Sequence, residues 1–235
     1  MSKSKKALDW AFRPAKKIGG QTYDFVADFG CGGNPRNPFN ARVLIGVDLG
    51  SEAQFETSPK LQYRSSIKGS RLPFSDNELD AITAFDVIEH IPRQSSGSDV
   101  NEFIEIMNEF HRILKPGGVL LAVTPCFPSP AVFVDPTHVN VITPETHLYF
   151  SDHNWARTMN YGFRGDFKTI SAGWYPWTGS WILESIQNPT TTESPDTVTQ
   201  AIRELRRKLK AFAALVRFLF QRGSRTHFLW ALKKV

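Results

Sequence analysis

Short apolar runs alternate with segments of helical periodicity along the first half of the chain. Runs rich in β-branched residues predict five buried strands, at 23–29, 43–49, 61–67, 79–86 and 119–123. Between residues 100 and 114 the apolar positions recur at helical spacing, and Lys115-Pro116-Gly117-Gly118 predicts the end of that helix. Because strands joined by helical crossovers run parallel, the pattern predicts an α/β, doubly wound, mostly parallel sheet.

The second half of the chain begins with a proline-rich and aromatic segment at about 125–160. We interpret it as an ordered insertion on the ligand side of the sheet, with short helices at about 144–151 and 153–160. Runs at 167–175 and 181–187 predict two late strands, which brings the sheet to seven. Residues 188–195 have the composition of a linker, and the segment 197–220 has the pattern of a basic amphipathic helix.

The net charge of +5 is unevenly distributed along the chain. Residues 1–17 and 196–235 are basic, whereas residues 18–195 contain more acidic than basic side chains. The basic segment 196–222 therefore predicts contact with an anionic membrane surface, with packing on the acidic body or on a second copy in a homodimer as the alternative. The acidic body argues against nucleic acid as the main partner, although contact of the basic ends with RNA stays open.

The composition limits the location of the protein and its metal chemistry. No stretch reaches the roughly 18 apolar residues of a membrane-spanning helix, and the N-terminus lacks the apolar run of a secretory signal. We therefore expect a cytoplasmic protein, peripheral at the inner membrane face if the basic segment binds lipid. The two cysteines, Cys31 and Cys126, predict neither a disulfide framework nor a metal site, and no metal site is expected elsewhere.

A glycine turn follows the first predicted strand and carries the main chemical signal. The turn is Asp28-Phe29-Gly30-Cys31-Gly32-Gly33, and Asp48 ends the next predicted strand, where its carboxylate can accept ribose hydroxyls. Pro35 and Pro38 follow at once, so the helix N-terminus that seats a dinucleotide pyrophosphate is short or absent. Asp28 would repel a pyrophosphate but attract an ammonium group. These details favour S-adenosylmethionine (SAM) over NAD.

Five segments in order resemble motifs of the class I SAM-dependent methyltransferases, in the small-molecule branch of that superfamily. They are Val26 to Gly32, Gly46 to Leu49, Arg71 to Ile82, Asp86 to Ile91 and Phe110 to Gly118. One departure concerns adenine, because Lys68 stands where relatives often carry an acidic residue. The resemblance covers about residues 23–125 and implies a Rossmann-like fold. Together with the charge and linker patterns, it leads us to expect a methyltransferase domain at 18–187, a basic extension at 1–17, a linker at 188–195 and a basic helical tail at 196–235.

The same resemblance implies SAM as the cofactor and assigns its binding residues. Asp28, Gly30 and Gly32 would surround the methionine end, Asp48 would bind the ribose and Leu49 would pack on the adenine. The full set of cofactor-binding residues that it implies is Asp28, Gly30, Cys31, Gly32, Asp48, Leu49, Ser70, Leu72, Phe85, Asp86, Val87 and His90.

The methyl acceptor is expected near Asp135-Pro136-Thr137-His138-Val139-Asn140, in the insertion after the fifth strand. His138 is the candidate catalytic base, oriented by Asp135 or Asn140. The segment resembles one in bacterial methyltransferases of sugars, lipids and polysaccharides, which implies O-methylation of a small-molecule or glycan- or lipid-linked acceptor. An RNA or protein methyltransferase that docks through basic ends, and a SAM-binding regulator without turnover, are the alternatives.

Overall fold

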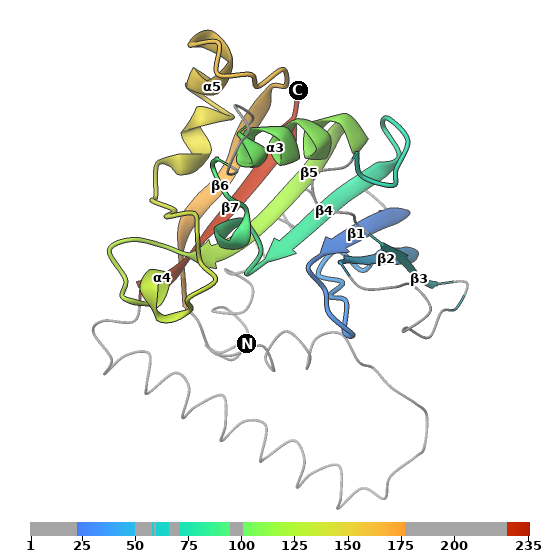
Figure 1. The fold of residues 1–235 in the computed structure, drawn as a ribbon. Helices are drawn as coiled ribbons and strands as arrows, with labels where there is room; N and C mark the ends of the chain where they lie inside the picture. The colour runs from blue at the N-terminus through green and yellow to red at the C-terminus, as the bar shows by residue number, and fades with distance from the viewer. Residues whose placement is uncertain (1–22, 50–57, 59, 66–70, 95–100, 177–224) are drawn as a thin grey trace, which may run out of the picture.

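A computed structural model describes residues 23–49, 58, 60–65, 71–94, 101–176 and 225–235, which form one seven-stranded sheet. The strand order is β3-β2-β1-β4-β5-β7-β6 (Figure 1). The strands are β1 (Phe25–Phe29), β2 (Val43–Asp48), β3 (Leu61–Ser65), β4 (Leu79–Phe85), β5 (Leu114–Pro125), β6 (Phe167–Pro176) and β7 (Arg225–Lys234).

The first five strands are parallel, as the apolar runs predict. β1 pairs with both β2 and β4, β2 pairs with β3, and β4 pairs with β5, all in parallel register. β7 is antiparallel to both of its neighbours, β5 and β6. The predicted α/β class and mostly parallel sheet are therefore confirmed. In such a sheet the carboxyl ends of β1, β2, β4 and β5 meet at one edge, and this edge is where open α/β sheets bind ligands.

Helix α3 (Glu102–Ile113) covers one face of the sheet (Figure 1). It begins where the side chain of Asn101 accepts a hydrogen bond from the Ile104 N–H, an N-cap that satisfies one of the unpaired donors of the first turn. The ring of Phe110 meets Phe29 of β1 edge-on at 4.9 Å between centroids. Because Phe110 is fully buried, this contact anchors α3 to the strand that carries the glycine turn.

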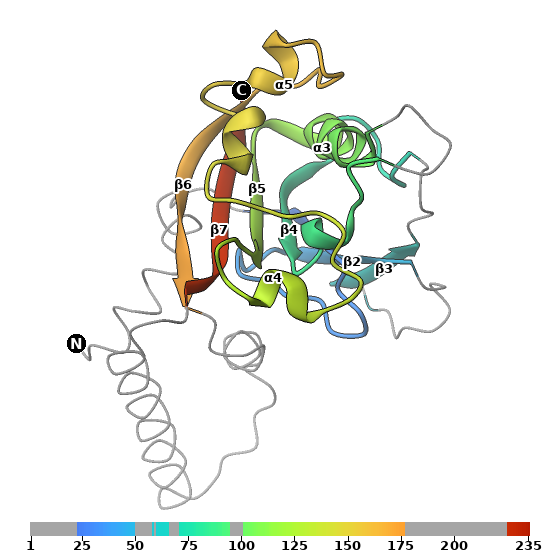
Figure 2. The ribbon, with the colours of Figure 1, turned by 60° about the vertical axis from the view of Figure 1, so that its left-hand side comes forward.

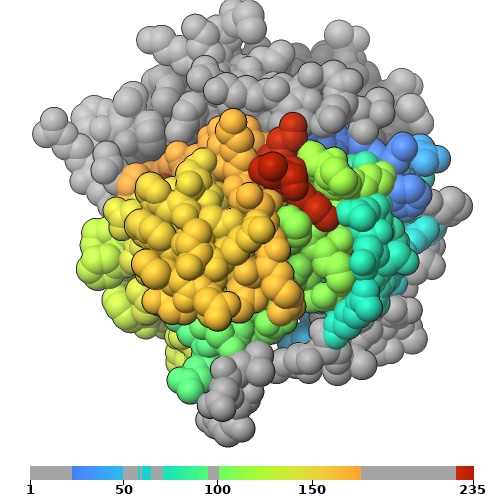
Figure 3. All heavy atoms as spheres, turned by 90° about the horizontal axis from the view of Figure 1, so that it is seen from above, coloured from blue at the N-terminus to red at the C-terminus, as the bar shows by residue number. Residues whose placement is uncertain are grey.

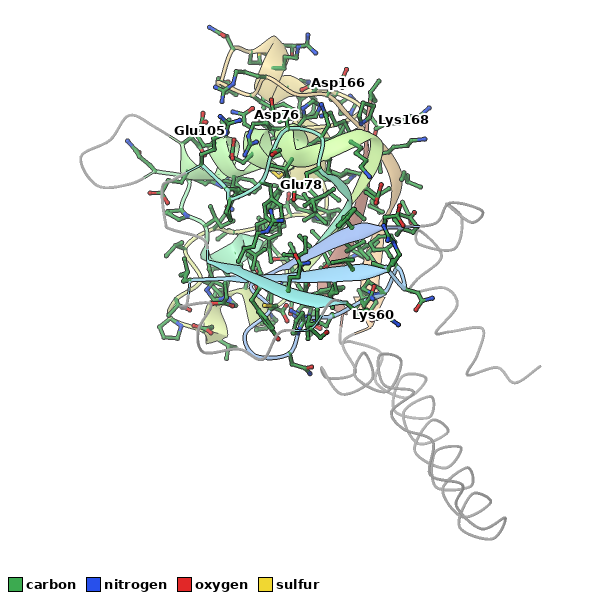
Figure 4. The ribbon with its side chains drawn as sticks, turned by 90° about the vertical axis from the view of Figure 1, so that its right-hand side faces the viewer. Lys60, Asp76, Glu78, Glu105, Asp166 and Lys168 are labelled. Carbon is green, nitrogen blue, oxygen red and sulfur yellow. The ribbon has the colours of Figure 1, made fainter. Side chains whose placement is uncertain are left out.

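Arg112, near the end of α3, holds the segment before β4 in place. Its guanidinium donates to the carboxylates of Asp76 and Glu109 and to the carbonyls of Leu72 and Phe74. Figure 4 shows Asp76 next to α3, which carries Glu105, whereas Lys60 lies on the opposite side of the fold. This network fixes the loop between residues 71 and 78 against the helix.

The insertion between β5 and β6 contains only short helices. They are α4 (Ala131–Val134), the 3-10 turn η3 (Thr146–Tyr149) and α5 (Trp155–Thr158), so the helices expected at about 144–151 and 153–160 shorten to single turns. Asn154 and Asn160 have positive φ values, 45° and 57°, on either side of α5, which ends regular helix there. Figure 2 shows α4 beyond the ends of β4 and β5, and Figure 3 shows the yellow and orange residues of the insertion and β6 as one continuous surface.

The expectation of a helical tail over 196–235 is wrong for its last part, because residues 225–234 form β7. This strand lies inside the sheet, so its residues Phe228 to Leu232 are buried on both faces. A strand buried on both faces is a continuous apolar run without alternation, which periodicity alone does not distinguish from a buried helix. The domain consequently extends from the first strand to residue 234 instead of ending at 187.

Several predictions concern residues outside the described ranges. They are the basic extension at 1–17, the strand at 181–187, the linker at 188–195 and the amphipathic helix at 197–220. Within the described ranges, no helix has the length and apolar character needed to cross a membrane.

The buried position of β7 generates a stability prediction. Trp230 has no exposed surface, and replacing a fully buried tryptophan by alanine leaves a large cavity. We expect Trp230→Ala to lower the free energy of unfolding by about 3–5 kcal/mol, measured by urea denaturation. Lys233→Ala, on an exposed position of the same strand, serves as the matched control and should change stability by less than about 0.5 kcal/mol. Equal effects of the two substitutions would contradict the central placement of β7.

Candidate functional site

The glycine turn after β1 adopts a backbone that only glycine accommodates at its key position. Gly30 and Gly32 have φ values of 63° and 55°. A Cβ built on Gly30 would lie 2.3 Å from Cγ2 of Val87, so a side chain there would displace the segment after β4. A Cβ on Gly32 would meet nothing within 4 Å, so space is open above the second glycine. A ligand can therefore approach the turn backbone at Gly32.

Asp48 at the end of β2 is joined to this turn. One carboxylate oxygen accepts from the Gly32 N–H at 2.8 Å, and the other accepts from the Leu49 N–H at 2.7 Å. A carboxylate has about four acceptor positions, so this arrangement leaves capacity for ligand hydroxyls. Leu49 beside it is 70% exposed, unusually open for a leucine. The structure thus brings Gly32, Asp48 and Leu49 together at the edge of the sheet.

Asp28 is placed differently from the expectation of an open carboxylate. It has no exposed surface, and it accepts hydrogen bonds from the Thr83 hydroxyl and from the Arg36 backbone N–H at 2.7 Å. The Arg36 guanidinium lies 3.4 Å from the same carboxylate, and it also donates to the Phe85 carbonyl at 3.3 Å. Burial raises the pKa of Asp28, while the charge of Arg36 opposes that rise. In this conformation Arg36 supplies the positive charge that was expected from a ligand ammonium group.

The other predicted cofactor residues differ in how close they lie to the glycine turn. Val87 borders the turn, because it packs on Gly30. Phe85 lies next to the segment that follows the turn, where the Arg36 guanidinium stacks over its ring at 4.5 Å. Cys31 is buried and its N–H donates to the Val47 carbonyl; burial raises the pKa of its thiol to about 12, so it is not a nucleophile. Leu72 is buried in the hydrophobic core, where its N–H donates to Glu109. Ser70 and Lys68 lie outside the described residues.

Asp86 follows β4 directly and has a strained backbone. Its φ is 55°, a value that asparagine and aspartate tolerate better than most residues. Its carboxylate lies 3.1 Å from Nε2 of His227 on β7. His227 was missed from the sequence because residues 225–235 were assigned to a tail, although its position opposite Pro125 in the β5–β7 register brings it to the ligand edge.

Glu89 lies in the one-turn helix η2 (Ile88–His90) and is 1% exposed. One of its oxygens, Oε2, accepts from the Thr124 hydroxyl at 2.8 Å. The other, Oε1, is buried and has no hydrogen-bond partner among the residues that the structure describes. Burial raises the pKa of Glu89 to about 8. A carboxyl group that is half-partnered and buried beside a ligand edge is a candidate functional group, and the sequence signal for it is its place next to His90.

His138 approaches Glu89 from the insertion. Its Nε2 lies 4.0 Å from Oε1 of Glu89, and its Nδ1 lies 3.0 Å from the Val132 carbonyl. A carbonyl only accepts, so Nδ1 carries a proton, and in the neutral form of the ring the lone pair is on Nε2. The ring of His90 meets His138 edge-on at 4.9 Å between centroids. The structure therefore joins His138 with His90, one of the predicted cofactor residues.

The residues expected to orient His138 have other partners. The Asp135 carboxylate accepts from the backbone N–H and the hydroxyl of Thr137, at 2.8 and 2.6 Å. Asn140 is buried, and its amide group bonds to the Ile88 carbonyl and to Arg93. The backbone N–H groups of Val139 and Asn140 both donate to the Glu89 carbonyl at 2.9 Å. Asp135 thus shapes the turn and Asn140 fastens it to η2, while Val132 orients the ring.

Comparisons with known proteins find similarity to methyltransferases. A family model described as "Methyltransferase domain" matches residues 27–122. The ubiquinone biosynthesis O-methyltransferase of Pseudomonas syringae pv. tomato is 25% identical over 103 residues. That match spans 40% of this chain and 40% of the length of the curated relative.

Solved structures resemble the whole fold at low sequence identity. A geranyl diphosphate methyltransferase in complex with SAM gives a TM-score of 0.52 at 17% identity, covering 99% of this chain and 85% of that one. A SAM-dependent methyltransferase from Mesorhizobium loti gives 0.50 at 15% identity, covering 98% and 99%. The [4+2]-cyclase SpnF gives 0.51 at 16% identity, covering 97% and 81%. These likenesses establish the fold.

The burial of Glu89 makes stability depend on pH. Its folded pKa of about 8 is above the usual glutamate value of 4.5, so the folded protein holds this proton more tightly than the unfolded chain. Stability from this group is fully present below about pH 4.5 and is lost as pH rises through about 8, by an amount on the order of a few kcal/mol.

Glu89→Gln should remove this loss of stability at high pH. Urea denaturation of the EDTA-treated protein across the same pH range measures the free energy of unfolding. Glu145→Gln, on an exposed position of the insertion, is the control and should keep the wild-type pH dependence. Parallel curves for wild type and Glu89→Gln would contradict a buried, protonated Glu89.

Proposed function

We propose that this chain, which belongs to the class I SAM-dependent methyltransferase superfamily, transfers the methyl group of SAM to a hydroxyl of a small or lipid-linked acceptor. The observation that carries the proposal is that one short segment, residues 87–89, connects the glycine turn with the acceptor side around His138. Val87 packs on Gly30 of the glycine turn, and two residues later Glu89 faces His138. A donor at the turn and an acceptor at His138 would therefore be neighbours.

The residues at the turn fit SAM. The open space above Gly32 admits a ligand close to the backbone, the Asp48 carboxylate retains acceptor capacity for ribose hydroxyls, and the exposed Leu49 offers an apolar face for adenine. The Phe85 carbonyl and Asp28 lie where an ammonium group would be held, once Arg36 turns toward a carboxylate. When bound, SAM supplies an electrophilic methyl group on a sulfonium.

The acceptor side combines polar groups with an apolar surface. His138 lies on a segment whose exposed side chains include Phe133, Val134 and Val139, at 67%, 78% and 57% exposure. Exposed apolar side chains gathered on one segment are typical of a surface that binds an apolar ligand or a membrane. They support an acceptor with a hydrocarbon part. The basic segment predicted at 196–222, outside the described residues, suits an acceptor held in an anionic membrane.

The chain's own groups contribute alignment, exclusion of water and control of a proton. Methyl transfer is an in-line displacement, so the acceptor oxygen must be held on the axis of the bond that breaks. The insertion, fastened to η2 through the Glu89 carbonyl and Asn140, covers this end of the sheet and holds His138 there. In neutral His138 the Nε2 lone pair lies on the side of Glu89, 4.0 Å from Oε1, and we assign to this nitrogen the uptake of the proton that the acceptor hydroxyl loses.

Binding of the cofactor is tested at Asp48. Asp48→Asn keeps the size of the side chain but removes a charged acceptor, a change worth about 1.5–3 kcal/mol. We expect the affinity for S-adenosylhomocysteine, measured by isothermal titration calorimetry, to fall by about 10- to 100-fold. Asp24→Asn, an exposed carboxylate just before β1 at the opposite end of that strand, is the control. No binding by wild type, or equal affinities for all three proteins, would refute the cofactor assignment.

Turnover is tested at His138. His138→Ala should lower the rate of methyl transfer by about 100-fold or more, with unchanged affinity for S-adenosylhomocysteine. The rate is measured as transfer of label from methyl-tritiated SAM into the solvent-extractable fraction of a cell lysate, and resistance of the labelled product to alkali distinguishes an ether from an ester. His153→Ala replaces an exposed histidine that stacks on Trp155 and should label at the wild-type rate. Near-normal labelling by His138→Ala would refute its role.

A further inference from the structure

Three potential metal ligands converge at the acceptor side of the site. Glu89, His90 and His138 each place one ligand atom within 4.8 Å of the other two. Ligand atoms around a tetrahedral ion with bonds of 2.0–2.1 Å are roughly 3.4 Å apart, so small rotations of these side chains would close the group around one ion. Glu89 and His90 belong to η2, and His138 comes from the insertion.

Both imidazole rings have the hydrogen bonds that orient metal ligands. Nδ1 of His138 lies 3.0 Å from the Val132 carbonyl, and Nδ1 of His90 lies 3.3 Å from the Thr137 carbonyl. A ring that donates its Nδ1–H to a carbonyl leaves the lone pair on Nε2, and this outer bond is the usual partner of a metal-bound histidine. The Thr137 hydroxyl, held by Asp135, also lies 3.0 Å from Nδ1 of His90.

Glu89 supplies an independent indication of a ligand, because one of its buried oxygen atoms is left without a partner in the part of the chain that the structure describes. Its Oε1 is buried, aims at His138 and has no hydrogen-bond partner among the described residues. Its other oxygen, Oε2, is occupied by the Thr124 hydroxyl, the outer bond expected of an oriented carboxylate ligand. When Glu89 is ionised and His138 is neutral, Oε1 and the Nε2 lone pair are both acceptors, 4.0 Å apart. A cation between them would satisfy both atoms and would displace the proton that Glu89 otherwise holds.

We propose that Glu89, His90 and His138 bind a first-row divalent cation such as Zn²⁺ or Mn²⁺. Two imidazoles and one carboxylate favour such ions over Mg²⁺ and Ca²⁺, which prefer oxygen ligands. Three protein ligands leave coordination positions open, as in catalytic metal sites.

The role of this cation rests on the proposed function. A hydroxyl bound at an open position would lose its proton more readily to solvent water, because a bound cation lowers the pKa of its oxygen ligand. His138 would then be a ligand of the cation instead of the group that takes the proton.

The site is tested by calorimetric titration of ZnCl₂ into the full chain, freed of any affinity tag, treated with EDTA and desalted. We expect one ion per chain, with at least a tenfold loss of affinity in Glu89→Gln, His138→Ala and His90→Ala. His90 is exposed, so its variant should fold normally even if the buried Glu89→Gln does not. His153→Ala should bind as wild type. Titration with Co²⁺ adds a spectroscopic readout, because imidazole coordination produces visible absorption bands that the triad variants should lose.

The outcomes separate this inference from the proposed function. Absence of a Zn²⁺ site, or a site whose affinity is unchanged in all three triad variants, would overturn the cation site whether or not the protein binds S-adenosylhomocysteine. Zn²⁺ binding that depends on the triad, in a protein that does not bind S-adenosylhomocysteine, would retain the site and refute the methyltransferase proposal.

Discussion

The contact of Val87 with Gly30 is the constraint on which the arrangement of the site depends. β1 and β4 are parallel neighbours, so the turns that leave their carboxyl ends lie against each other. The absence of a side chain at Gly30 lets the second turn approach, since a Cβ there would lie 2.3 Å from Val87. Glu89 and His90 follow Val87 in the same segment, so this contact helps to place them. The glycine therefore sets the spacing between the donor side and the acceptor side.

Both apolar packing and hydrogen bonds hold the insertion at the site, since its residues Ile142 and Phe150 are buried in the main core. Its links to η2 include the N–H groups of Val139 and Asn140 on the Glu89 carbonyl, the buried Asn140 amide and the contact of Thr137 with His90. Backbone bonds of this kind fix position closely but contribute only about 1 kcal/mol each. The surface around them remains apolar and exposed, which suits a segment that must admit an acceptor.

The sequence predicted the parallel strands, the glycine turn and Asp48, because these features have local signatures. Apolar runs mark buried strands, and glycines mark turns with positive φ. It did not predict β7, since a strand buried on both faces lacks alternation, nor His227, which reaches the site only through that strand. Arg36 and the orienting role of Val132 were also missed. A side chain that folds back on Asp28, and a carbonyl that fixes a tautomer, depend on tertiary contacts that leave no periodic pattern in the chain.

The position of β7 also affects the order in which the sheet can form. β5 ends at Pro125 and its partner β7 begins at Arg225, so about a hundred residues must be synthesised between the two pairing segments. Until β7 arrives, β5 is an apolar edge strand with unpaired backbone groups, and β6 is separated from the sheet that it will join. Pairing over such a sequence distance is slow because of loop-closure entropy. During translation the nascent chain would carry an exposed, aggregation-prone edge, a state for which chaperones are suited.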